Sequence, residues 1–168
     1  MKMLMILLSS LLLGTSAGIA QAQMDHSHMP LEVPEDVQVP ALDLRLRSDV
    51  MSGYNLHLET RHFVLEPPPA QMNMRQMMSA SRDPRSGVLS GHAHLYVNGR
   101  KVQRLYAADV HLPASLFKTG VNQITVTLNN HGHMDLVHQG RQILASLFVD
   151  PAATPAIVHR FAAQSPSD

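Results

Sequence analysis

The chain alternates between apolar and polar residues over many short stretches. Residues 41–47 place Leu42, Leu44 and Leu46 between charged residues, and residues 54–59 repeat the alternation. Successive side chains of a β-strand point to opposite faces, so one face of each such stretch is apolar. The pattern therefore predicts half-buried strands.

Similar stretches follow, separated by turn-forming residues. They lie at 63–65, 91–97, 102–107, 109–112, 121–128, 135–138 and 142–149. These short strands, with almost no helix signal, predict an all-β fold, a single antiparallel immunoglobulin-like or cupredoxin-like β-sandwich with Greek-key-type connections. Residues 41–150 are enough for one hydrophobic core and too few for a second domain.

One methionine-rich segment, residues 70–90, interrupts the strand pattern. Its four methionines stand at positions 72, 74, 77 and 78. Residues 72–79 are compatible with two helical turns, in which the last three methionines would share a face. Two interpretations stay open, a soft site for Cu(I) and a lid that fills a gap over the sandwich.

The N-terminus has the pattern of an export signal. Lys2 precedes an apolar run over residues 3–13, and Ala20-Gln21-Ala22 has the form of a signal-peptidase site. We expect a signal peptide over residues 1–22 and a periplasmic or secreted product. No later stretch is long and apolar enough for a membrane span.

Two further segments lack the composition of a packed core. Residues 23–40 are rich in proline and polar residues and include His26 and His28, and residues 151–168 are small residues and prolines. We expect a flexible leader containing His and Met, and a disordered tail. Whether the leader histidines bind metal stays open.

Composition narrows the chemistry. Signal cleavage would remove one of 13 basic residues and none of 13 acidic ones, so the charge balance argues against nucleic-acid binding. The chain has no cysteine, which excludes disulfides and thiolate ligands, but it has 11 histidines and 11 methionines. Imidazole and thioether groups are the donors that suit copper, Cu(II) and Cu(I) respectively.

The segment Gly91–Gly99 holds the first candidate ligands. On a strand His92 and His94 share one face, whereas Ala93 and Leu95 share the other. Asn98-Gly99 supplies the two positive-φ residues of a tight hairpin turn. The segment predicts a strand with a paired-histidine face; the alternative interpretation is two solvated histidines.

A metal site needs three or four donors from different elements. Besides His92 and His94, the candidates in order are His111, His131, Met51, His57 and His133. We assign no catalytic residue, because the sequence shows no catalytic triad, no recognisable carboxylate pair and no phosphate-binding loop.

Several stretches together carry a resemblance. They are Met51–Thr60, Gly91–Gly99, Arg104–Tyr106 leading to His111, and Thr125–Asn129 before a histidine. They resemble a group of small exported bacterial proteins with an immunoglobulin-like or cupredoxin-like sandwich. The resemblance spans residues 42–149 and implies periplasmic handling of a metal, copper in particular, rather than a named reaction.

We therefore predict a copper-binding protein that sequesters copper or passes it on by ligand exchange. Its expected partners are the metal ion and a periplasmic protein that donates or accepts it. One alternative is a non-catalytic module that binds a protein or carbohydrate. The other is a copper-dependent redox enzyme, which would need an open coordination position. The sequence leaves the number of sites and the oligomeric state open.

Overall fold

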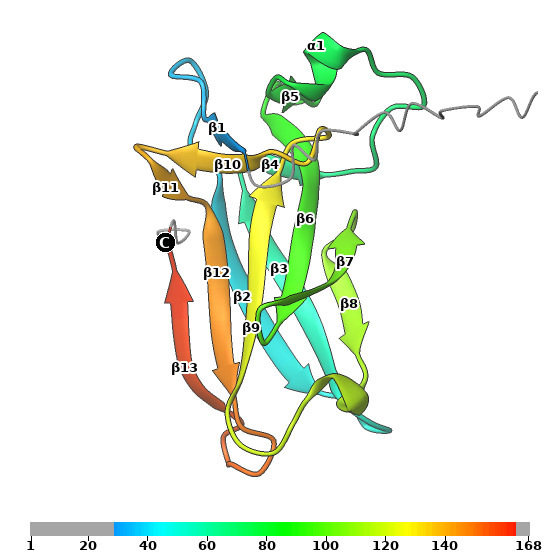
Figure 1. The fold of residues 1–168 in the computed structure, drawn as a ribbon, viewed down its shortest axis with the longest axis vertical. Coiled ribbons are helices and arrows are strands. Elements are labelled where there is room, and N and C mark those ends of the chain that lie inside the picture. The colour runs from blue at the N-terminus through cyan, green and yellow to red at the C-terminus, as the bar shows by residue number, and fades with distance from the viewer. Residues whose placement is uncertain (1–28, 164–168) are drawn as a thin grey trace, which may run out of the picture.

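The computed structural model describes residues 29–163, and almost all regular secondary structure in this part of the chain is β-strand. Figure 1 shows two layers of strands, with most of the short elements at one end of the molecule. The prediction of an all-β protein is confirmed. Among the described residues, no helix is long and apolar enough to cross a membrane.

The smaller layer has the strand order β2-β3-β8 and is antiparallel throughout. Its strands are β2 (Ala41–Ser48), β3 (Tyr54–Arg61) and β8 (Asp109–Leu112). A short 3₁₀ turn (Ala114–Leu116) follows β8. The predicted strands at these positions are confirmed to within two residues.

The larger layer follows the order β1-β10-β9-β12-β13, and β6 joins it by pairing with β9. The main strands are β1 (Pro30–Glu32), β10 (Asp135–His138), β9 (Asn122–Asn129), β12 (Leu144–Val149), β13 (Ile157–Ala162) and β6 (Leu89–Val97). Beside β6 lie β4 (Phe63–Leu65), β5 (Ser81–Arg82) and β7 (Arg100–Leu105), and β11 (Arg141–Gln142) pairs with β10.

Two strand pairs in this layer are parallel, β1 with β10 and β4 with β6. The prediction of a purely antiparallel sandwich is therefore wrong at these pairs. Both involve three-residue strands that enter from loops rather than hairpins, and their pairing gives partners to backbone groups that would otherwise be unsatisfied. Sequence alternation does not report strand direction.

The hydrophobic core lies between the two layers and follows the predicted alternation. Leu42 and Leu44 of β2 are fully buried, as are Ala93 and Leu95 of β6. Other core side chains come from β3, β9 and β12: Leu56, Leu58, Ile124, Val126, Leu128, Ala145, Leu147 and Val149. Each of these strands therefore has one face in the core, and the opposite face of β6 is left for other chemistry.

The expected leader is partly ordered. Residues 30–32 form β1 on the edge strand β10, and the buried Val33 donates its N–H to Val137 O at 2.9 Å. A flexible leader to residue 40 is therefore wrong from residue 30 on. The reason is long-range pairing, which composition does not encode. The expected signal peptide (1–22), His26 and His28 lie outside the described residues.

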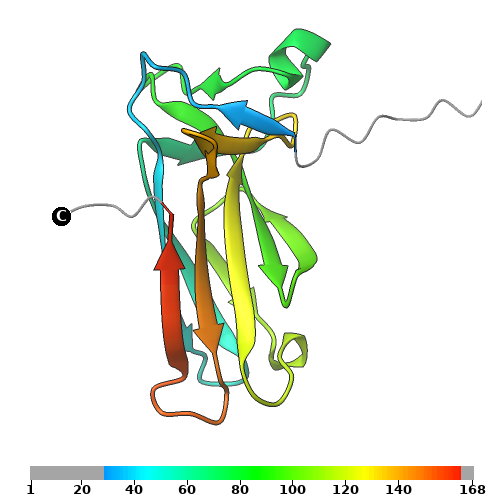
Figure 2. The same cartoon turned by 60° about the vertical axis from the view of Figure 1, so that its left-hand side comes forward.

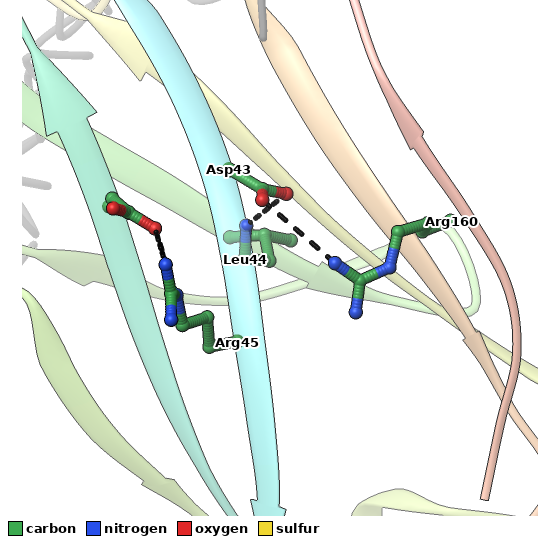
Figure 3. Close-up of polar contacts among 5 residues, drawn as sticks. Asp43, Leu44, Arg45 and Arg160 are labelled. Carbon is green, nitrogen blue, oxygen red and sulfur yellow. Dashed lines mark hydrogen bonds and ion pairs between the residues drawn. The ribbon is translucent and has the colours of Figure 1, made fainter. Parts of the chain in front are cut away.

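The expected disordered tail also contains a strand. β13 pairs antiparallel with β12 and forms the sheet edge in Figures 1 and 2. Figure 3 shows Arg160 of β13 directed at Asp43 of β2, with 3.9 Å between Nη1 and Oδ2. The tail prediction is wrong for residues 157–162, because this segment contains Ile157, Val158 and Phe161 and forms a backbone ladder with β12. Residues 164–168 lie outside the described part.

The methionine-rich segment forms one helical turn, α1 (Met74–Met77), instead of two. Asn73 starts it with a capping box, in which its side chain accepts from Gln76 N (3.0 Å) and its own N–H donates to Gln76 Oε1 (2.9 Å). Met74 and Met77 remain exposed, at 64% and 37%. The segment thus adds no side chain of α1 to the core.

Candidate metal centre

Strand β6 directs His92 and His94 away from the core, as predicted. The two-residue turn at Asn98 and Gly99 has positive φ at both residues (52° and 75°), which fixes the hairpin with β7. Both histidines are nevertheless only 1% exposed. The interpretation of two solvated rings is therefore wrong, because other parts of the molecule cover this face.

The loop between β9 and β10 brings a third histidine over the pair. His133 has a positive φ of 69°, and its N–H donates to Asn130 O at 3.1 Å. Asn130 also accepts from Met134 N through Oδ1 at 2.9 Å. These contacts close a tight turn that places the His133 ring against β6.

The three rings converge on one small space. His92 Nε2 lies 2.9 Å from His94 Nε2 and 3.0 Å from His133 Nδ1, and the third separation, His94 Nε2 to His133 Nδ1, is 3.3 Å. The rings of His94 and His133 are nearly parallel, at 17°. Three nitrogens from two elements therefore face one another.

These separations are close to those of a metal site. Tetrahedral ligands about 2.0–2.1 Å from one ion lie about 3.3 Å apart. The three nitrogens are within a few tenths of an ångström of that value, so an ion just outside their plane would reach all of them. A fourth coordination position would face away from the three rings.

Burial keeps the two strand histidines neutral. Desolvation, assisted by the charges of His133 and Arg104, lowers the pKa of His92 to about 3. Desolvation, with the charges of Lys101 and His92, lowers the pKa of His94 to about 2. At neutral pH both rings therefore keep a lone pair, which is the form that binds a metal.

The second ring nitrogens of His92 and His94, their Nδ1 atoms, make no hydrogen bond among the described residues. Both atoms are buried. Metal-binding histidines usually donate this N–H to an acceptor. Here packing in β6 and ring contacts orient the rings, including the Tyr106 ring 5.6 Å from that of His92.

Two cationic side chains from β7 border the cluster. Lys101 Nζ donates to His94 Nε2 at 3.1 Å, and Arg104 is directly opposite His94 in the ladder. Sequence analysis missed both. The hairpin turn could have identified Lys101, because a two-residue turn at 98–99 pairs position 101 with Tyr96, on the face of His94.

Three predicted ligands lie on the other layer. His57 donates through Nδ1 to Asp109 Oδ1 at 2.7 Å, and His111 donates through Nδ1 to Asn55 Oδ1 at 3.2 Å. Met51 is 89% exposed in the turn between β2 and β3. The structure does not bring these residues to the three-histidine cluster, because β3 and β8 belong to the smaller layer.

His131 is near the cluster but outside it. Its buried ring has Nε2 at 3.7 Å from Glu66 Oε1, and desolvation lowers its pKa while Glu66 opposes the shift. We ranked His131 above His133, and the structure reverses the order. His133 alone of the two contacts His92 and His94.

The methionine-rich segment contacts the ligand-bearing loop through its backbone. Asn130 Nδ2 donates to Met77 O (2.8 Å) and Ser79 O (2.9 Å), which satisfies carbonyls at the end of α1. A Cβ on Gly132 would overlap Met77 O, so glycine permits this close approach. The segment therefore supports the loop that carries His133.

Comparisons with known proteins give no relative. A scan against models of protein families found no match, and searches of curated proteins and of solved structures found none. The fold and the site alone therefore define the class: an all-β protein with a cluster of three histidines, two of them buried, that could hold a metal ion.

Proposed function

We propose that this protein binds a transition metal, copper, at His92, His94 and His133, and that it stores the ion or passes it to a partner outside the cytoplasm. The observation that carries the proposal is the convergence of three imidazole nitrogens within 3.3 Å of one another. Two of these histidines are buried and neutral. A neutral imidazole ring keeps the lone pair that a metal ion needs.

Copper is supported by the donor types. Imidazole nitrogen suits zinc, copper, iron and nickel, and thioethers favour Cu(I). The exposed methionines of α1 are on the segment that contacts the His133 loop. The signal-like N-terminus supports a location where copper occurs in both oxidation states.

The proposed fold family is an immunoglobulin-like or cupredoxin-like sandwich. Its support is the facing of two β layers around one core (Figure 2) and the resemblance of residues 42–149 to small exported proteins. In such a scaffold, loops at one end of the sandwich carry sites. The loop with His133 lies at the same end as β1 and α1.

The test is competition-based affinity for Cu(I) and Cu(II) on the purified protein and on His133→Ala. We expect near-stoichiometric binding, weakened by more than about 100-fold in the variant, because even outer-shell changes cost 10–100-fold. His92→Ala/His94→Ala should abolish the site. His57→Ala and His111→Ala are matched controls and should bind as the unmodified protein does.

Copper bound equally by His133→Ala and the unmodified protein would contradict this site. So would loss of binding in His111→Ala alone. Absence of tight binding by the unmodified protein would reject the proposed function as a whole.

A binding or assembly module is the second candidate, and one observation favours it. β13 ends the larger sheet and exposes Val158 (49%) and Phe161 (53%). Sheet edges pair readily with another strand. This function predicts partner binding that persists in His92→Ala/His94→Ala and is lost when charges replace the two apolar residues.

A further inference from the structure

Two positively charged side chains, Lys101 and Arg104, lie beside the histidine cluster. Lys101 Nζ is 3.1 Å from His94 Nε2. Arg104 pairs with His94 across the β6–β7 ladder. The charges of both side chains act on both strand histidines and lower the pKa of each. An ion bound to His94 would therefore lie within a few ångströms of an ammonium group.

The three histidine ligands do not neutralise the positive charges of Lys101, Arg104 and a bound ion. Three neutral imidazoles bring no negative charge to the ion, whereas carboxylates and thiolates would. The nearby carboxylate of Asp135 accepts from Asn129 Nδ2 at 2.6 Å, and its charge acts on Tyr96. Asp135 does not belong to the group of side chains whose donor atoms converge, which is His92, His94 and His133.

The cost of the site therefore rises steeply with the charge of the ion. Desolvation of an ion grows with the square of its charge, and repulsion from the two cations grows in proportion to it. His92 and His94 are almost completely buried, so water offsets little of this cost on their side. Both desolvation and repulsion from the two cations therefore disfavour a divalent ion relative to a monovalent one.

We propose that Lys101 and Arg104 make the three-histidine centre selective for monovalent Cu(I) over divalent Cu(II) and Zn(II). This inference rests on the proposed function and adds the oxidation state of the bound ion. The two residues act as specificity-determining groups through charge, without having to be ligands. The positive charges of Lys101 and Arg104 therefore favour binding and transfer of copper as Cu(I).

The test compares the affinities for Cu(I) and Zn(II) in Lys101→Gln and Arg104→Gln. Removing one positive charge beside the ligand nitrogens should raise the Zn(II) affinity about tenfold more than the Cu(I) affinity. A tenfold change corresponds to a fall of about 59 mV in the Cu(II)/Cu(I) potential. The effect should shrink as salt increases from 0.01 to 1 M, an order-of-magnitude range of screening lengths.

Lys118→Gln is the matched control, because Lys118 lies at the opposite end of β9 and carries the same charge. It should leave the affinity ratio and the potential unchanged. Since Lys101 and Arg104 are exposed, we expect their variants to fold, and circular dichroism checks this.

Three outcomes separate the two proposals. No tight binding of any ion by the unmodified protein rejects the proposed function and this inference with it. Tight Cu(I) binding with an affinity ratio that the variants leave unchanged, or shift as Lys118→Gln does, overturns the inference alone. The inference is supported if the variants raise the ratio of Zn(II) affinity to Cu(I) affinity and if high salt reduces this rise.

Discussion

The histidines of the two layers differ in burial and in the side chains that they contact. On the larger sheet, His92 and His94 are 1% exposed and their rings face each other and His133. On the smaller sheet, the His57 side chain is 47% exposed and contacts Asp109, and His111 contacts Asn55. All four histidines lie on strands, on the face opposite the one that packs in the core.

The difference lies in what surrounds each ring. A histidine beside a carboxylate on an open surface has a partner for its proton and access to water. His92 and His94 are almost completely buried, and their Nδ1 atoms have no hydrogen-bond partner among residues 29–163. Strand alternation places both groups on outer faces, but only burial against the loop at residues 130–134 makes the first group a candidate metal site.

The largest expected difference between the buried and the exposed histidines is their effect on stability at low pH. The pKa of His92 is lowered to about 3 and that of His94 to about 2, whereas the unfolded chain has about 6.5. Below pH 6.5 the unfolded state binds more protons, so the stability these groups have above that pH is lost as pH falls toward the folded values. By pH 5 we expect a loss of about 1–2 kcal/mol for each histidine after allowance for screening, measured by urea unfolding.

The comparison variants are His92→Leu/His94→Leu and His111→Ala. The first should flatten the fall in stability between pH 6.5 and 5, because no buried imidazole remains on β6. The second should keep it. An equally steep fall in the leucine variant would show that acid sensitivity arises elsewhere in the molecule.

The glycine under α1 tests whether the loop positions His133. In Gly132→Ala the new Cβ would overlap Met77 O, so the loop and α1 must separate. We expect a loss of about 1–3 kcal/mol in unfolding free energy from overpacking and weaker copper binding. Asn130→Ala, which removes the two bonds to Met77 O and Ser79 O, should act in the same direction.

Gly87→Ala is the control for this test, because a Cβ there meets nothing within 4 Å. Its positive φ of 73° gives it a modest stability cost of its own. It should leave copper affinity intact. Unchanged affinity in both Gly132→Ala and Asn130→Ala would mean that α1 does not position His133.

Local alternation was enough to predict most strands. β2, β3, β6, β9 and β10 were expected from periodicity, because one face of each is in the core. β4 was expected at residues 63–65, but its parallel direction was not. β1 and β13 were not predictable in this way. Their order comes from backbone pairing with distant segments, such as Pro30 with Asp135 and His159 with Phe148.

All three histidines of the cluster were candidates from the sequence, but only the pairing of His92 with His94 followed from a pattern. His92 and His94 share a strand face, which spacing alone gives. His131 and His133 both lie in one loop, and a positive φ at His133 with Gly132 against Met77 decides which ring turns toward β6. That choice depends on a contact 55 residues away in the chain, between positions 77 and 132, which no local pattern contains.

The smallest expected effect belongs to the exposed pair. His57→Ala removes an ion pair to Asp109 in which both side chains are largely open to solvent, 47% and 81%. Such pairs contribute about 0–1 kcal/mol, so urea unfolding should detect a change below about 1 kcal/mol that vanishes in high salt. A larger loss, or a loss of copper binding, would show that the smaller sheet shares in the site, and the contrast between the two layers would no longer hold.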